Sequence, residues 1–281
     1  MKKQFLLVAG VCVALTSLAQ NDTTAKSSVT NSGDTIHVGS MIIVKNGNER
    51  TGDGTEVQIH RRHDHKPANL ITSWFEFDLG FANFNDKTNY SSFAAQQFAP
   101  GATGEWFNLR NIKSVDVNIW FFMQRLNAIK HVVNLEYGLG LELNNYRYTE
   151  NIKYLKNPTE IVMSPMNYRK NKLAADYITV PILLNFNFTP RRSDGFGISV
   201  GVSAGYLYSS RQKLISSQTG KTKTHDNFDL QPWKISWLGE IQLGPVRLYG
   251  SLATQSMFKK GLDQIPYTAG IRFPIPTIEK Y

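Results

Sequence analysis

From residue 70 onward, apolar and polar side chains alternate with a period of two over stretches longer than an ordinary strand. In the clearest stretch, 133–144, every second residue is Val, Leu or Tyr, and those between are Asn, Glu or Gly. Successive side chains on a strand point to opposite faces, so this pattern predicts a strand with one apolar and one polar face. About a dozen residues is enough to cross a bilayer, whereas most strands have only about five or six.

The alternation predicts eight such strands, and their connections are alternately long and short. The expected strands are 75–82, 115–124, 133–144, 177–188, 196–208, 233–243, 246–252 and 267–275. The expected short joins are Leu126–Ile129, Pro190–Gly195 and Gly244–Pro245, and the long ones are Phe84–Asn111, Thr149–Leu173, Arg211–Phe228 and Ser256–Pro266. Transmembrane barrels combine an even strand number with tight periplasmic turns and longer outer loops. The sequence therefore predicts an all-β fold, an eight-stranded antiparallel up-and-down transmembrane β-barrel over residues 71–276, with both termini periplasmic.

The N-terminus has the pattern of a secretory signal peptide. Lys2 and Lys3 precede the apolar run Phe5–Leu18, and small residues precede a cleavage site after Ala19. That run is shorter than the roughly 20 residues of a spanning helix, which argues against a membrane anchor. Cys12 lies inside the run, not at its end, which argues against a lipoprotein. The mature chain then has no cysteine and no disulfide framework.

The rest of the chain divides by composition. Residues 20–70 predict a flexible periplasmic leader with a short strand or hairpin at 34–45, and residues 277–281 a C-terminal tail. No later segment approaches 18 continuous apolar residues, which excludes a helical membrane protein.

Alternation alone leaves open which face meets lipid, because a lipocalin-type barrel would place its apolar face inward around a ligand. The polar face is rich in glycine and serine, which suits a crowded interior. Aromatic residues gather near the predicted strand ends, as in interfacial girdles. They are Phe84, Tyr146, Tyr148, Phe188, Tyr206, Tyr208, Trp233 and Tyr267. We therefore expect the apolar face to meet lipid.

The polar face then predicts an ion network inside the barrel, because buried charges must be paired or hydrogen-bonded. Its expected members are Glu76, Asp78, Asp116, Glu136, Glu142, Asp176, Lys234, Glu240, Arg247 and Arg272. An eight-stranded barrel is just wide enough for side chains to fill it, so we expect a structural plug and negligible conductance, not an ion path. Pro181 and Pro274 predict local bulges or kinks, since proline cannot donate to the ladder.

Three segments resemble a known family. Tyr177–Leu184 (YITVPILL), Trp74–Gly80 (WFEFDLG) and the stretch 34–45 resemble the outer-membrane β-barrel family of Bacteroidetes-type bacteria, which includes PorT-like proteins of a secretion and gliding system. The resemblance covers about residues 70–275. It implies an outer-membrane barrel in a Gram-negative cell, but a secretion role does not follow from these motifs.

The last strand is similar to the signal that the barrel assembly machinery reads. The residues that match are Thr268, Gly270, Phe273 and Ile275. The usual signal ends at the chain terminus, whereas this chain continues to Tyr281. We expect the assembly machinery to be a partner during biogenesis.

Basic residues concentrate in the long connections, in a chain of net charge +9. They include Lys153, Lys156, Arg169, Lys170, Lys172, Arg211, Lys213, Lys221 and Lys223. If those loops face outward, they meet lipopolysaccharide phosphates. Outer-membrane lipid and lipopolysaccharide are thus the expected partners, with a periplasmic or secretion-system protein as a further one. An exported barrel is not expected to bind nucleic acid.

No catalytic or metal constellation emerges. His60, His63 and His65 match no closed zinc-site spacing, and His225 with Asp226 lacks an evident partner serine. We therefore expect no cofactor, no metal and no enzymatic activity. The expected role is structural or interaction-based; the alternatives are a secretion or gliding accessory protein and a lipid- or lipopolysaccharide-modifying enzyme.

Overall fold

A computed structural model describes residues 35–38, 41–44, 68–190 and 195–273. The chain divides into two compact units, residues 1–65 and 66–281. In the first unit, β1 (Thr35–Val38) and β2 (Met41–Val44) pair antiparallel, within the range that predicts a short strand or hairpin. The predicted signal peptide, the histidines at 60–65, Pro274 and the tail 277–281 lie outside the described residues.

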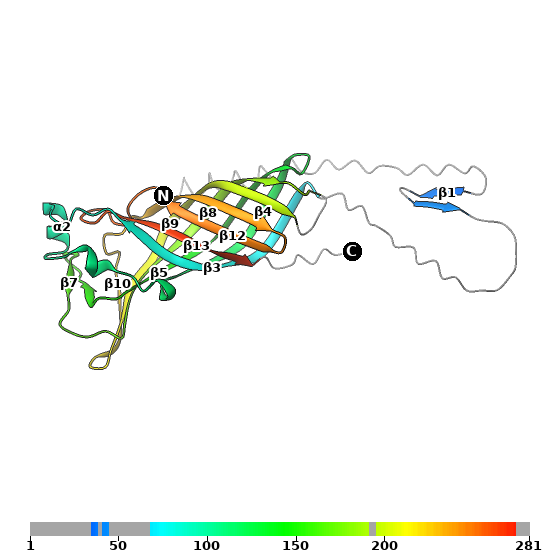
Figure 1. The fold of residues 1–281 in the computed structure, drawn as a ribbon. Coiled ribbons are helices and arrows are strands. Elements are labelled where there is room, and N and C mark those ends of the chain that lie inside the picture. Colours follow the sequence, from blue (N-terminus) through cyan, green and yellow to red (C-terminus); the bar gives the residue numbers. More distant parts are fainter. Residues whose placement is uncertain (1–34, 39–40, 45–67, 191–194, 274–281) are drawn as a thin grey trace, which may run out of the picture. The chain divides into compact units, whose positions relative to one another are not determined.

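Eight strands of the second unit form a closed ring (Figure 1). They are β3 (Leu70–Asp86), β4 (Val115–Ile129), β5 (Val133–Tyr148), β8 (Lys170–Asn187), β9 (Phe196–Ser216), β11 (Trp233–Leu243), β12 (Val246–Ala253) and β13 (Gln264–Phe273). Each strand pairs antiparallel with the one before it, and β13 pairs with β3 to close the ring. The predicted all-β, eight-stranded up-and-down barrel is confirmed.

The ring has a turn end, with short connections, and a loop end, with long ones. Two of the expected short joins hold, but Leu126–Ile129 is wrong, because β4 continues to Ile129 and the turn is 130–132. Lys130 and His131 both have positive φ, and the Val132 amide donates to the Ile129 carbonyl at 2.9 Å. Two central residues of positive φ make a turn that follows the twist of a hairpin, which is why the strands can pair right up to it.

The long connections are folded, not open loops. The β3–β4 connection holds α2 (Phe93–Phe98) and the short 3-10 turns η1 (Gly104–Phe107) and η2 (Asn111–Lys113). The β5–β8 connection holds the hairpin β6 (Ile152–Tyr154) and β7 (Ile161–Met163). The expected loop Arg211–Phe228 is wrong over most of its length, because β9 runs on to Ser216 and pairs with β10 (Gly220–His225). No described helix is long and apolar enough to cross a membrane.

The outward face of the ring is apolar, and the inward face is polar, so the lipocalin-type arrangement is wrong. The large outward side chains with more than half of their surface exposed include Trp74, Leu79, Phe81, Phe188, Trp233, Trp237 and Phe273. Aromatic pairs mark both edges of this surface: Phe188 with Phe196 at the turn end, and Tyr206 with Trp233 toward the loop end, with ring centroids 5.3 and 5.0 Å apart. From Phe196 to Tyr206 the chain rises roughly 33 Å along β9, or about 25 Å along the axis at the usual tilt, which matches the apolar band of a membrane barrel.

A bulge in β4 reverses its alternation. The pairing with β5 shifts register between Trp120 and Phe122, so that Phe121 is the extra residue. Before it, even-numbered residues such as Trp120 point inward; after it, Met123 is buried and Phe122 packs outside against Trp74, with ring centroids 6.2 Å apart. Strict alternation predicts Met123 outward and Phe122 inward, and both of those predictions are wrong. At Pro181 no bulge forms, since the pairing keeps one register on both sides of it.

Interior glycines make room for large side chains. A Cβ on Gly140 would lie 2.6 Å from the Trp120 ring, and a Cβ on Gly80 would lie 2.5 Å from the Tyr249 hydroxyl. Such distances are far inside van der Waals contact, so these sites accept only hydrogen. The glycine-rich polar face is therefore the wall against which the interior packs, as expected for a barrel of this width.

Candidate functional site: a charged interior beneath a capped mouth

Arg272 of β13 organises the centre of the interior. Its guanidinium donates to both carboxylate oxygens of Asp78, at 2.7 and 2.9 Å, and to Glu240 at 2.6 Å. It also lies 5.4 Å from the centre of the Trp120 ring, whose indole N–H donates to Asp78 at 2.8 Å. One buried cation thus ties β3, β4, β11 and β13 together. Such charge-assisted, bidentate contacts are the strongest hydrogen bonds available to a buried arginine.

Lys234 forms a second centre closer to the loop end. Its ammonium pairs with Glu142 and lies 5.3 Å from the centre of the Tyr177 ring. Glu142 also accepts hydrogen bonds from Asn144 at 3.1 Å and Thr179 at 3.3 Å. These contacts join β5, β8 and β11 across the lumen. The carboxylate of Glu142 is therefore fully engaged in cross-strand contacts.

Asp116 is the exception among the interior acids. Its carboxylate accepts hydrogen bonds from the Tyr249 hydroxyl at 2.6 Å and the Asn118 amide at 3.0 Å. Among the described residues, no lysine or arginine forms a salt bridge with it. Both donors reach Oδ2, and the buried Oδ1 has no hydrogen-bond partner, so this fully buried acid is only partly satisfied.

Two further pairs lie at the turn end. Arg247 reaches Glu76 at 3.6 Å, and Arg125 donates to Glu136 at 2.6 Å. Arg125 is absent from the predicted network, because strict alternation along β4 assigns it to lipid. The bulge at Phe121 turns it inward. The sequence carries one signal for this: an arginine directly opposite the expected interior residue Glu136 in the paired strand.

Asp176 does not join the network. It is buried, but its neighbours Ala175 and Tyr177 point inward, so Asp176 lies on the outward side of β8. There it pairs with Arg211. The remaining nine predicted members line the lumen.

Little empty space is left between these side chains. A cavity of about 50 Å³ opens among Met123, Arg125, Glu136, Arg247 and Arg272 near the turn end. A second cavity, of about 20 Å³, lies deeper, against Asp78, Trp120 and Tyr249. Since one buried water needs roughly 10–15 Å³ of such space, each of these two cavities has room for a few waters at most.

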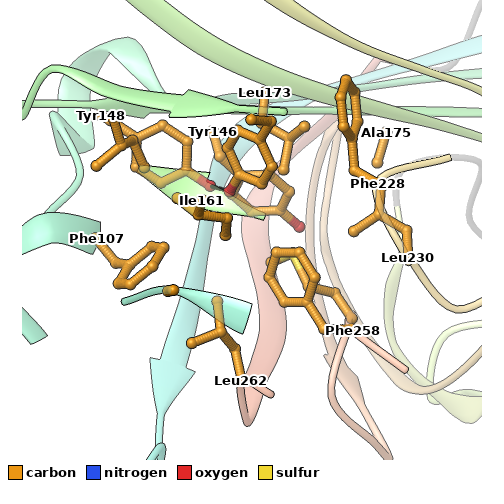
Figure 2. Packing of buried hydrophobic residues seen from close by; sticks show 14 of the residues in the cluster. Phe107, Tyr146, Tyr148, Ile161, Leu173, Ala175, Phe228, Leu230, Phe258 and Leu262 are labelled. Carbon is orange, nitrogen blue, oxygen red and sulfur yellow. Dashed lines mark hydrogen bonds between the residues drawn. The ribbon is translucent and has the colours of Figure 1, made fainter. Parts of the chain in front are cut away.

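At the loop end, the four long connections build one hydrophobic core over the barrel mouth (Figure 2). Each connection supplies a buried aromatic residue: Phe98, Tyr154, Phe228 and Phe258. Tyr154 lies 5.3 Å from Phe228 and 6.5 Å from Phe258, and Phe258 lies 5.6 Å from Phe98, between ring centroids. We call this structure the cap. The sequence does not predict the cap, because its aromatics are scattered singly along the four connections and belong to no periodic run.

Three residues expected in the interfacial girdle belong to the cap instead. Tyr146 and Tyr148 point inward from the end of β5 and are almost fully buried, and Phe84 packs against the same core. The Tyr148 hydroxyl hydrogen-bonds that of Tyr154 at 2.8 Å, which ties the barrel wall to β6. The cap is thus continuous with the barrel.

Two cap tyrosines have strongly perturbed acidities. The Tyr90 hydroxyl donates to Asp86 at 2.5 Å, and burial together with that carboxylate raises the Tyr90 pKa above its usual value. Burial raises the pKa of Tyr154 as well, and the neighbouring Tyr148 adds to the effect. Both phenols therefore stay neutral well above pH 10, the ordinary pKa of tyrosine being about 10.

The rim pair His225 and Asp226 has no catalytic geometry. His225 is exposed at the end of β10, opposite Arg211. The Asp226 carboxylate accepts from the backbone amide of Asn227 at 2.8 Å and so closes its own turn. Among the described residues, no group of three or more His, Cys, Asp or Glu side chains is placed to hold a metal ion.

The residues of the assembly motif lie on both faces of β13. Thr268 points inward and shares a hydrogen bond of 2.8 Å with Ser251, and Gly270 lies opposite Gly80 at the seam. Phe273 is exposed on the outward face. Ile275 lies outside the described residues.

A closed barrel with an apolar exterior and a charged, filled interior defines the class of transmembrane β-barrels. A family model described as outer membrane protein beta-barrel domain matches residues 75–262, well over half of the chain. The chain belongs to this family and is an integral outer-membrane protein. No curated protein matches it. The family match stops before β13, which the structure supplies as the strand that closes the ring.

Proposed function

We propose that this chain is a non-enzymatic, non-conducting outer-membrane protein whose cap serves as a binding surface. One observation carries the proposal: all four long connections fold into a single hydrophobic core over the mouth of the barrel. Loops that only gate a pore need no shared core of this size. A folded cap instead presents a rigid surface, and rigid surfaces bind with a smaller entropic cost than flexible loops.

The interior supports the same reading. A conducting barrel needs a continuous aqueous path, whereas here Arg272 and Lys234 cross-link opposite walls through Asp78, Glu240 and Glu142. These contacts hold the wall rigid beneath the cap. The charged residues serve stability, and the exposed cap serves recognition.

The proposed orientation places the loop end outside the cell and both termini in the periplasm. Phe93 and Ile112 project from the cap with 82% and 84% of their surface exposed. Cys12 is the only cysteine of the sequence and lies in the predicted signal peptide. Phe93→Cys and Ile112→Cys would therefore each give the mature chain a single thiol. On intact cells, a membrane-impermeant maleimide should label both. The control Lys130→Cys, at the turn end, should be labelled only after the outer membrane is permeabilised; the reverse pattern would invert the orientation.

The binding role is tested on the same surface. Site-specific cross-linkers at positions 93 and 112 should trap a discrete partner in native outer membranes. In the double variant Phe93→Ser/Ile112→Ser, the cross-linker is placed at position 105 instead, and this variant should no longer trap that partner. If the trapped species are the same with and without both apolar side chains, the cap is not the binding surface.

As a second candidate, we propose a PorT-like accessory role in secretion or gliding. The observation in its favour is that β1 and β2 form a hairpin in a unit separate from the barrel, which would serve as a periplasmic handle. The residues 177–184 and 74–80, which resemble that family, lie in β8 and β3. Removing residues 21–66 should then abolish secretion while the barrel still assembles. Normal secretion by the truncated protein would exclude this role.

We propose no catalytic role for His225. Its replacement by alanine should leave the lipid A composition of the outer membrane unchanged. A changed lipid A profile would instead support the lipid-modifying alternative.

A further inference from the structure

A row of cations crosses the outward face of four neighbouring strands. Arg147 of β5 lies directly opposite Lys172 of β8, Lys172 opposite Lys213 of β9, and Lys213 opposite Lys223 of β10. Directly opposed residues of an antiparallel pair point to the same face, with Cβ atoms about 5 Å apart. Four adjacent strands thus carry four like charges side by side in one cross-strand row. We call these four residues the cation row.

Like charges directly opposite each other destabilise a sheet, so the row is unfavourable unless something neutralises it. Among the described residues, none of the four forms a salt bridge. Asp176, which lies on the same outward side of β8, already pairs with Arg211. More positive charge surrounds the row, since Lys221 lies two residues before Lys223 and Lys170 two before Lys172.

Hydrogen bonding within the row is also incomplete. Arg147 donates from Nη2 to the Arg169 carbonyl at 3.0 Å, but its buried Nε has no acceptor. Lys172 donates to the Asn145 amide oxygen at 2.5 Å, which leaves two of its three N–H groups for other acceptors. The side chains of Lys213 and Lys223 make no hydrogen bond to any described residue. The row therefore offers donors as well as charge.

The position of the cation row relative to the membrane indicates which ligand can reach it. Tyr208 and Tyr206, exposed on the same side of β9, mark the edge of the apolar band. Lys213 is five residues beyond Tyr208, roughly 12 Å along the axis at the usual strand tilt, whereas the headgroup layer reaches roughly 5–8 Å beyond the hydrocarbon, so the lysine ammonium must reach back by several ångströms to meet it. Flexible lysine stems extend or retract their ammonium groups by several ångströms. A ligand at this level must be anchored in the adjacent leaflet.

We propose that the cation row binds the phosphates of an outer-leaflet glycolipid of the lipopolysaccharide type. The inference rests on the proposed orientation, in which the loop end lies outside the cell. It adds a ligand for the barrel wall below the cap. Phosphate suits the row because Arg147 can engage it bidentately and the lysines supply point charges. The acyl chains would lie on the apolar outward faces of β8 and β9, directly below.

The test uses the full mature chain, purified in detergent and freed of lipid. The probes are hexa-acylated lipid A with both phosphates, the same lipid without phosphates, and inorganic phosphate. The variant Lys172→Gln/Lys213→Gln/Lys223→Gln is compared with the control Lys87→Gln/Lys130→Gln/Lys259→Gln, which removes the same charge elsewhere. Heat-shifted mobility on gels shows that each variant is folded before binding is measured.

The proposal expects the triple variant to bind phosphorylated lipid A at least tenfold more weakly than wild type, while the control binds like wild type. Binding of phosphorylated lipid A by wild type should weaken as the salt concentration rises. Wild type should bind the dephosphorylated lipid as weakly as the triple variant binds it. Equal binding by the triple variant and its control would overturn the proposal, as would equal binding of the two lipids. Displacement of lipid by inorganic phosphate at equal concentration would assign the row to free anions and also overturn it. The cysteine-labelling test of orientation is independent of all these outcomes.

Discussion

Arg272 and Asp78 lie directly opposite each other at the seam where the last strand of the barrel meets the first. The guanidinium holds the carboxylate through two hydrogen bonds, of 2.7 and 2.9 Å, and both side chains are almost completely buried. Nearly the whole length of the barrel separates them in sequence, so the pair forms only when the ring closes. It links closure of the fold to satisfaction of its most buried cation.

Removing Arg272 should be the most damaging single change in the interior. Arg272→Met leaves Asp78 and Glu240 without their cation, and breaking a buried pair typically costs about 3–5 kcal/mol. Unfolding in urea from lipid vesicles should show this loss. The matched change Arg247→Met, at the partly exposed rim, should cost less, because Arg272 still lies 3.9 Å from Glu76. Equal losses would mean that the seam pair has no special role.

For folding of the barrel, the extra residue at position 121 should be more important than the phenylalanine side chain that it carries. Deleting Phe121 restores strict alternation, so that Arg125 points toward lipid and Glu136 stays in the interior without its partner. A lipid-facing arginine costs up to about 2–4 kcal/mol. The deletion should therefore fold poorly, as judged by heat-shifted mobility. Phe121→Leu keeps the extra residue and should fold like wild type. A deletion that folds normally would show that β4 tolerates either register.

The cap should unfold separately from the barrel. Tyr154→Ala removes the ring shared by Phe228 and Phe258, and truncating a buried aromatic costs roughly 3–5 kcal/mol. Limited proteolysis should then cut the connections at the loop end while the ring of strands keeps its heat-shifted mobility. Ile112→Ala, at an exposed cap position, should leave the protease pattern unchanged. Simultaneous loss of barrel and cap in Tyr154→Ala would contradict their independence.

Alkaline pH should weaken the cap. Burial and the Asp86 carboxylate raise the pKa of Tyr90 in the folded state, so its stabilising contribution is complete below the unfolded pKa of about 10 and is lost as pH rises through the folded value. Absorbance at 295 nm should show phenols that ionise late, and Tyr90→Phe should lower the amplitude of this late component by one phenol, since Tyr154 remains. A Tyr90 that titrates near pH 10 in the folded protein would show that its hydroxyl meets solvent.

The sequence was sufficient for the barrel because a lipid-facing surface imposes a strict rule. Every second residue must be apolar over a full crossing, and β5 and β8 follow this rule without a break. The rule fails where a single extra residue changes the phase. Phe121 reads as one more apolar residue, so Met123, Phe122 and Arg125 are all assigned to the wrong side of β4.

The cap was beyond sequence reasoning for a different reason. Its core takes single aromatics such as Phe98, Tyr154, Phe228 and Phe258 from connections far apart in the chain, and none of them belongs to a periodic run. Only the ring of strands brings these connections together. The interior network was easier to anticipate, because each of its members except Arg125 follows from strand phase alone; Asp176, which was expected in it, lies outside it.

We propose that this outer-membrane barrel is filled and does not conduct. Recordings from folded, purified protein in planar bilayers test it most directly. We expect no steady conductance from wild type, and none from Tyr154→Ala, because the contacts of Arg272 and Lys234 close the lumen below the cap. A large, steady pore in wild type would contradict the claim.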